Sequence, residues 1–382
     1  MTGIRVLIIG GGPAGLVTGI ALARIGARVR IVERESAQTP TGVAVNIQNS
    51  PLRALAALGL IDEIVAAGHT TATVHLLDAD GAPTAPPLRP RTLVPGYPAS
   101  IELHRSDLAR ILERTALDSG VDLRYAVSVS ALHDESDDDA HRARTARVDV
   151  TFTDGTADAF DLVVAADGIR SSTREVVFGQ DAAVPVYSGQ CIWRAEAERG
   201  DIDELMMLSG PEGKLGLLPL SDDTLYVYLL KSFAAEPSRG DIGDVDAALR
   251  AGVSAFGGPA TGIAATLRPG ADFRGLYSVL QPAPWHRGRV VLVGDAAHAT
   301  TPHLAYGFGL AVEDALVLAE SLQVENDVPA ALRSFTARRI PRCRLVVENS
   351  RQLSDWEQHA PADASAYGRL MADSMSALTE LP

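Results

Sequence analysis

The stretch Ile4–Glu33, IRVLIIGGGPAGLVTGIALARIGARVRIVE, decides the fold. It opens with a short continuous apolar run at 4–9, which predicts a strand buried on both faces. A glycine turn, a helical pattern over 13–25 and a second strand over 27–32 follow, and Gly26 stands where a helix C′ glycine belongs. Strand, helix and strand in so short a span predict a right-handed βαβ unit.

The turn between the first strand and the helix carries Gly10, Gly12 and Gly15 in G-x-G-x-x-G spacing. The first glycine permits a tight turn, the second lets the backbone approach a pyrophosphate, and the third allows close packing of helix on strand. The helix N-terminus favours the phosphate, because its N–H groups are free. Glu33 ends the second strand about 20 residues after Gly12, where a carboxylate accepts both ribose hydroxyls. We predict a dinucleotide site without a 2′-phosphate, since Glu33 is acidic.

The composition favours a soluble globular enzyme. The 382 residues include 34 Lys and Arg against 48 Asp and Glu, a formal net charge of −14, which disfavours nucleic acid or an anionic membrane surface as partner. Cys191 and Cys343 are too few and too far apart for a disulfide framework. No apolar run is long enough for a membrane span, and no signal-peptide pattern opens the chain. We expect a cytoplasmic protein without a metal site.

The rest of the chain alternates between helices, buried strands and β-rich segments. Helices are expected near 50–59, 102–120 with Ser106 as N-cap, 245–256, 309–322 and 329–356. Strands are expected at 69–79 (antiparallel and outside the parallel sheet), 160–166, 289–293 and in a β-rich section over 184–230. Loops are expected over the proline-rich segment 81–98 and over 134–147, where acidic residues precede basic ones.

Two further motifs follow buried strands. Residues 167–174 (DGIRSSTR) come directly after the strand at 160–166, and residues 294–298 (GDAAH) come directly after the strand at 289–293. Each motif alone could be a strand-end turn with a capping acid. Three motifs in this order at these separations are hard to explain by chance.

Together the motifs resemble those of the class A FAD-dependent aromatic monooxygenases, the para-hydroxybenzoate hydroxylase type, over residues 4–355. One departure is Ala-Tyr-Gly at 305–307, where many members have Gly-Gln-Gly. The expected fold class is α/β: a Rossmann-like FAD-binding domain with an inserted β-rich substrate domain and C-terminal helices. The expected bounds are 1–70, 100–182 and 276–356 for the FAD-binding domain, 71–99 and 183–275 for the substrate-binding domain, and 357–382 for a C-terminal helical tail.

The resemblance also implies the residues that hold FAD. From the pyrophosphate turn through the adenosine to the flavin ring, the matching positions are Gly10, Gly12, Ala14, Gly15, Glu33, Arg34, Val129, Arg105, Asn46, Asp295, Gly307, Phe308, Gly309 and Leu310. The segment at 167–174 implies contacts to both FAD and NAD(P)H by Asp167, Arg170 and Arg174. The helix opening at Gly307 would face the N1–C2=O edge of the flavin, where a helix N-terminus stabilises the negative charge of the reduced ring.

The implied activity is hydroxylation of a small aromatic or heteroaromatic substrate through a flavin C4a-hydroperoxide, with NAD(P)H and O2 as co-substrates. NADH or NADPH would bind transiently, because no second G-x-G-x-x-G is present. One alternative is a flavin-dependent reductase or dehydrogenase of the same fold acting on a non-aromatic substrate, and another is a flavin-binding regulator. The ring hydroxylated, its regiochemistry, any catalytic base, the nicotinamide preference and the choice between monomer and homodimer stay open.

The β-rich section is expected to supply the substrate site. Tyr226 is the predicted catalytic residue, since it resembles a substrate-contacting tyrosine of purine-hydroxylating relatives. Further substrate candidates are Trp193, Arg194, Tyr228, His303 and Tyr306, with Lys214 and His75 behind them. For each candidate in the β-rich section the competing interpretation is an ordinary packed or solvent-facing sheet residue. His298 is expected to be structural, and both cysteines to be plain thiols.

Overall fold

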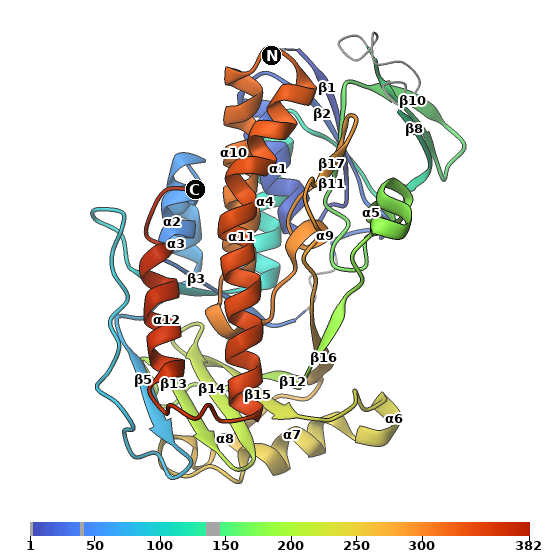
Figure 1. Ribbon diagram of the computed structural model, residues 1–382. Coiled ribbons are helices and arrows are strands. Elements are labelled where there is room, and N and C mark those ends of the chain that lie inside the picture. The colour runs from blue at the N-terminus through green and yellow to red at the C-terminus, as the bar shows by residue number, and fades with distance from the viewer. Residues whose placement is uncertain (1–2, 39–41, 135–145) are drawn as a thin grey trace.

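The computed structural model describes residues 3–38, 42–134 and 146–382. Within them the chain forms two large sheets joined by a long helix, α11 (Val328–Gln358), which runs from the helices beside the first sheet down to the second sheet (Figure 1). The α/β class predicted from the sequence is confirmed. The domain bounds given above stay a prediction.

The first sheet is built on the expected βαβ unit, β1 (Arg5–Ile9), α1 (Pro13–Arg24) and β2 (Arg28–Val32). Both strands are parallel, and Gly26 has a φ of +83° after α1, as predicted for a C′ glycine. The full strand order is β17-β18-β11-β1-β2-β7, in which only β17 is antiparallel. The bounds of the added strands are Asp122–Arg124 for β7, Leu162–Ala165 for β11, His286–Arg287 for β17 and Val290–Leu292 for β18.

Helices α1, α4 and α10 form one layer beside this sheet. Helix α1 packs between α4 (Arg105–Asp118) and α10 (Gly307–Val324), and α11 then packs on α10. The short helices α5 (Ser172–Phe178) and α9 (Asp295–His298) follow β11 and β18. The C-terminal helix α12 (Ala366–Ala377) lies along α11 (Figure 1). Among the described residues, no helix combines the length and apolar character that a membrane span requires.

The second sheet has the order β16-β12-β15-β14-β13-β5. Its strands are Asp272–Ser278 for β16, Val186–Glu198 for β12, Thr224–Ser232 for β15, Gly213–Pro219 for β14, Leu205–Gly210 for β13 and Val74–Asp78 for β5. Side chains alternate between its faces. Leu225, Val227 and Leu229 are fully buried in a cluster with residues of α7 (Val245–Val253) and α8 (Ile263–Thr266), near α6 (Arg239–Ile242). Tyr226 and Tyr228 therefore occupy the opposite face.

Two smaller sheets complete the fold. The first contains β3 (Ala44–Gln48), β6 (Ser100–His104) and β4 (His69–Thr70), near helices α2 (Ser50–Ala57) and α3 (Ile61–Ala67). The second contains β8 (Val129–Asp134), β9 (Val148–Phe152) and β10 (Ala157–Phe160). Ala44 of β3 packs in one cluster with Leu205, Leu218, Leu220 and Tyr226. This contact brings the β3 sheet against the tyrosine face of the second sheet.

Three sequence-based element assignments were wrong in detail. The strand predicted at 69–79 is split into β4 and β5, and β5 pairs with β13 in parallel. The helix expected from 102 begins at Arg105 with His104 as N-cap, so Ser106 lies inside its first turn. Residues 100–104 form a strand instead, because Ile101 and Leu103 bury one face against the core. Residues 160–166 hold the end of β10 and all of β11. Most of the loop expected at 134–147 lies outside the described residues.

Candidate active site

The glycine turn before α1 leaves no room for side chains at two of its positions. Gly10 has a φ of +108°, and a Cβ there would lie 2.5 Å from the Ala166 carbonyl oxygen. A Cβ on Gly15 would lie 1.9 Å from the Gly10 carbonyl oxygen. At Gly12, by contrast, a Cβ would meet no atom within 4 Å, and this N-cap residue offers no side chain to the first N–H groups of α1. An open backbone at an uncapped helix N-terminus is suited to bind an anion.

Glu33 lies directly beside this turn. Its carboxylate accepts hydrogen bonds from the backbone N–H of Gly11 at 2.7 Å and of Glu35 at 3.0 Å. The side chain of Arg34 next to it is 80% exposed. The Glu33 carbonyl also accepts from Val127, which leads to Val129 at the start of β8. The predicted adenosine-binding residues therefore come together at the end of β2.

Asp295 and Arg105 lie at the other end of the candidate cofactor site. Asp295 begins α9 and its side chain is exposed, yet desolvation by the surrounding protein raises its pKa, while His298 and Arg105 act in the opposite direction. Arg105 donates from its backbone N–H to Val43 and from Nε to Ala44, each at 3.0 Å. Burial, together with repulsion by Arg194, lowers the pKa of the Arg105 guanidinium, while attraction by Tyr226 and Asp295 opposes this. These four residues come from separate segments of the chain, yet they lie close enough to one another to influence the pKa of Arg105.

The first turn of α10 lies close to α2. A Cβ on Gly309 would lie 2.3 Å from Cγ of Pro51, so glycine permits this close approach. Gly307 and Phe308 are half-buried, whereas Gly309 and Leu310 are buried. No side chain caps this N-terminus, so its first backbone N–H groups stay available to a ligand.

The residues of the 167–174 motif mostly serve the fold. Asp167 accepts from the Ser171 hydroxyl at 2.5 Å and from the Thr173 backbone N–H at 3.0 Å, so it caps α5. Arg174 is fully buried and donates to the carbonyls of Ala183, Ala296 and Ile169. The expectation that Arg174 contacts NAD(P)H is therefore wrong, because its donors are directed to the protein backbone.

Tyr226 lies at the interface between β3 and the second sheet. It is 8% exposed, and its hydroxyl makes no hydrogen bond within the described part of the chain. Burial raises its pKa to about 12, although Arg194 and Arg105 act in the opposite direction. Its ring lies 5.9 Å from that of Tyr228, centroid to centroid. At neutral pH the Tyr226 hydroxyl is thus protonated and free to donate to a ligand.

The neighbouring strand β12 divides its two substrate candidates between the two faces. Arg194 pairs across the sheet with Tyr228, and its Nε donates to Asp272 at 2.8 Å. Trp193 faces the other way and packs against Phe273, with ring centroids 4.6 Å apart. The expectation that Trp193 contacts substrate is wrong, because strand alternation places it in the core under the sheet.

Tyr306 and His303 are also engaged within the protein. Tyr306 is fully buried and donates to Glu313 at 2.9 Å, away from any ligand, so its assignment as a substrate contact is wrong. The ring of His303 is 1% exposed, with Nε2 3.2 Å from Glu357, and its contact with substrate stays a prediction. Glu357 in turn accepts from Lys214 Nζ at 2.5 Å and from the Tyr367 hydroxyl at 2.7 Å. This buried cluster joins the second sheet to α11 and α12.

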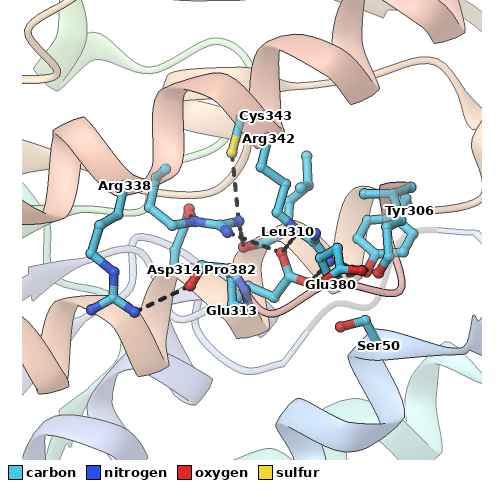
Figure 2. A network of polar contacts seen from close by, with 12 residues as sticks. Ser50, Tyr306, Leu310, Glu313, Asp314, Arg338, Arg342, Cys343, Glu380 and Pro382 are labelled. Carbon is cyan, nitrogen blue, oxygen red and sulfur yellow. Dashed lines mark hydrogen bonds and ion pairs between the residues drawn. The ribbon is translucent and has the colours of Figure 1, made fainter. Parts of the chain in front are cut away.

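Sequence reasoning missed a buried ion-pair network between α10 and α11 (Figure 2). Arg339 contacts Asp314 at 2.7 Å and Glu313 at 3.0 Å, and all three side chains are fully buried. Asp314 also accepts from the Gly294 backbone N–H at 2.8 Å and contacts His298 at 2.6 Å, so the network supports the turn before Asp295. The sequence does carry a signal for this network. Two adjacent acidic residues lie in an otherwise apolar helix, and arginines follow in the next helix.

Three members of this region have the residue types of a metal site. His298, Asp314 and Cys343 bring their potential ligand atoms within 4.8 Å of one another. The Asp314 carboxylate already contacts Arg339, His298 and a backbone N–H. The Cys343 sulfur lies 3.5 Å from the Arg339 guanidinium. The contacts define a hydrogen-bonded ion-pair network in which His298 has the structural role expected of it.

Sequence reasoning also missed Glu102. This residue of β6 is fully buried and accepts from the hydroxyls of Thr71 at 3.1 Å and Ser100 at 2.9 Å, and from the Asn46 amide. Among the described residues no cation pairs with it. Burial raises its pKa to about 7 although these donors lower it. A lone glutamate between two apolar residues, Ile101 and Leu103, was the available signal.

We expect Glu102→Gln to stabilise the protein above pH 7. Between the ordinary pKa of 4.5 and a folded-state value of about 7, the unfolded chain releases a proton that the folded chain keeps. Stability of the wild type therefore falls as pH rises through this window, by about 3 kcal/mol in all. In urea unfolding, the free energy of unfolding of Glu102→Gln relative to wild type should therefore rise by about 3 kcal/mol between pH 4.5 and pH 8. The same difference for the exposed-site control Glu320→Gln should stay constant. A pH-independent difference would contradict the prediction.

Known proteins resemble this chain in sequence and in fold. Residues 3–350 match the family model described as FAD binding domain. Aurachin C monooxygenase/isomerase of Stigmatella aurantiaca is 31% identical over 93% of this chain and 91% of that protein. The 3-amino-4-hydroxybenzoate 2-monooxygenase of Streptomyces cremeus is 31% identical over 94% of this chain and 88% of that protein. An HpxO variant from Klebsiella pneumoniae complexed with FAD has a TM-score of 0.81 and 25% identity, over 98% of this chain and 96% of that chain.

The fold and the glycine turn define a dinucleotide-binding flavoprotein. The chain belongs to the FAD binding domain family, and its relatives make it an FAD-dependent monooxygenase of the class expected from the motifs. The residues present fit FAD. Gly12 leaves open space at an uncapped helix N-terminus, Glu33 holds a carboxylate beside it, and Asp295 presents an exposed carboxylate at the start of α9.

Proposed function

We propose that the chain uses NADH or NADPH and O2 to hydroxylate a small aromatic or heteroaromatic ring. The observation that carries this proposal is the position of Tyr226, whose unpartnered hydroxyl lies in electrostatic range of Arg194 and Arg105, which in turn interacts with Asp295. When bound, FAD would supply the redox and oxygen-transfer chemistry. Relatives named as a urate hydroxylase and a 3-amino-4-hydroxybenzoate monooxygenase act on such rings.

The cofactor would be held by residues that the structure brings to one edge of the first sheet. The pyrophosphate would lie on the turn of Gly10, Gly12, Ala14 and Gly15, with the ribose on Glu33. Asp295 and the first turn of α10, Gly307 to Leu310, would hold the ribityl chain and the flavin ring. Arg34 and Val129 stay proposed adenine contacts, and Asp167 a proposed contact that also caps α5.

The substrate would lie between β3 and the tyrosine face of the second sheet. Apolar side chains of Leu205, Leu218 and Leu220 would exclude water from this region. The Tyr226 hydroxyl would donate to an oxygen of the ring. Arg194 and Arg105 favour negative charge there, so they would stabilise a phenolate-like substrate. Tyr228 would pack beside the ring, since it lies flat over Gly216 on the same face.

The experiment combines an absorbance spectrum of the purified protein with NADH and NADPH oxidation against a panel of aromatic acids, pyridines and purines. A flavin spectrum, with oxidation stimulated by one compound that gains an oxygen atom, is the expected result. Stimulated NAD(P)H oxidation without oxygen incorporation would instead favour the reductase reading. A protein that takes up no FAD would overturn both.

We expect Tyr226→Phe to lower product formed per NAD(P)H consumed about tenfold, the value of one hydrogen bond to the reacting ring. The Kd for FAD should change less than twofold, because the hydroxyl has no partner in the part of the chain that the structure describes. Tyr187→Phe is the matched control, since its hydroxyl contacts Cys191 at 3.3 Å and lies away from Tyr226. Equal coupling in the Tyr226 and Tyr187 variants would contradict this role.

A further inference from the structure

Asn46 presents an unused hydrogen-bond acceptor beside the candidate substrate region. Its amide nitrogen donates to Ser100 Oγ at 2.8 Å and to the Glu102 carboxylate, its cross-strand neighbour. Because both hydrogens are used there, the carbonyl Oδ1 is directed away from Glu102. No described group donates to Oδ1, and the side chain is only half-buried.

The side chain of Asn46 lies on the face that meets the tyrosines. Ala44, two residues earlier, shares that face of β3 and packs with Leu218 and Tyr226. The carbonyl of Ala44 also binds Arg105. The free Oδ1 therefore belongs to the wall opposite Tyr226, where the proposed function places the ring ligands.

Glu102 determines which way this amide is turned. Above its pKa of about 7 the Glu102 carboxylate is ionised and can only accept, so the Asn46 NH2 group must then face it. Within the described ranges no cation compensates the burial of the carboxylate, which is kept in place by Thr71 and Ser100. A residue that is unfavourable for the stability of the fold is often retained for a function.

We propose that Glu102 is a positioning residue, which turns Asn46 Oδ1 toward a ring N–H or O–H donor and thereby selects ring ligands that carry one. This inference rests on the proposed function. The same donor chemistry can come from two sources, the imide N–H of the flavin ring or an N–H or O–H of the substrate. In either case the ligand loses this hydrogen bond when its donor is methylated.

The test compares ligands with and without the donor. FAD and 3-methyl-FAD are titrated into apoprotein by flavin fluorescence. The pairs 3-hydroxypyridine with 3-methoxypyridine, and 4-hydroxybenzoate with 4-methoxybenzoate, are titrated into the FAD-loaded protein by flavin absorbance. The proteins are wild type, Glu102→Gln, Asn46→Val and the control Thr71→Val, which loses a donor to Glu102 but leaves Asn46 untouched. Circular dichroism checks that each variant is folded.

We expect wild type and Thr71→Val to prefer the donor-bearing member of at least one pair about tenfold, and Glu102→Gln and Asn46→Val to lose that preference. Loss confined to the FAD pair assigns the donor to the flavin, and loss confined to an aromatic pair assigns it to the substrate. A preference absent from wild type, or unchanged in Glu102→Gln, would overturn the inference. Failure to take up FAD at all would contradict the proposed function itself.

Discussion

Replacing Arg339 with methionine is expected to lower the free energy of unfolding by about 3–5 kcal/mol. The guanidinium contacts Asp314 and Glu313, and all three side chains are without solvent exposure. Methionine fills similar space but leaves the two carboxylates with one cation fewer. Breaking a buried ion pair from one side is costly because the remaining charge stays desolvated.

The adjacent Arg338→Met provides the matched control. Arg338 is 39% exposed and contacts Glu320 at 2.8 Å on the surface, so its loss should change stability by less than about 1 kcal/mol. Urea unfolding at pH 7 measures both variants. If the two arginine variants lost the same stability, the network would not have the structural role that we assign to it.

Replacing Gly12 with alanine is expected to weaken FAD binding at least 100-fold, about 2.7 kcal/mol, while stability of the apoprotein changes by less than about 1 kcal/mol. A Cβ at this position meets no protein atom within 4 Å, so the folded chain can accept it. The methyl group would instead occupy the place where the pyrophosphate must approach the backbone.

Gly368→Ala is the control for this variant. Its Cβ also meets nothing within 4 Å, but Gly368 lies in α12, away from the turn. Fluorescence titration of FAD and thermal unfolding of the apoproteins separate the two effects. Undiminished FAD affinity in Gly12→Ala would show that the pyrophosphate does not lie on this turn.

The elements predicted correctly from sequence depend on local signals. The βαβ unit of β1, α1 and β2 follows from the largely apolar segment at 4–9, a helical pattern and Gly26. The turn glycines could be assigned roles in advance, since a positive φ or a close backbone approach requires glycine wherever the rest of the chain lies. Residues 100–104 were misassigned because their alternation of polar and apolar residues is short and leads directly into α4.

Local sequence patterns could not separate the substrate candidates from ordinary core residues. Trp193 and Arg194 are neighbours on β12, and both faces of the second sheet carry aromatic and aliphatic residues. The alternation along a strand predicts that the two side chains lie on opposite faces of the sheet. It does not predict which face borders the candidate site. That depends on the packing of α7 and α8 against one face and of β3 against the other. Tyr306 is a similar case, since its orientation is set by Arg342 on α11.

The α/β fold, the glycine turn and the class of chemistry could be predicted from sequence, because each depends on residues that are close along the chain. Where each candidate side chain lies depended on the tertiary structure. Tyr226 and Arg194 lie on the sheet face toward β3, Trp193 and Tyr306 lie in the core, and Glu102 lies beside Asn46. The physical reason is that burial and pairing of polar groups are properties of segments that meet only after folding, as Asp314 and Arg339 do.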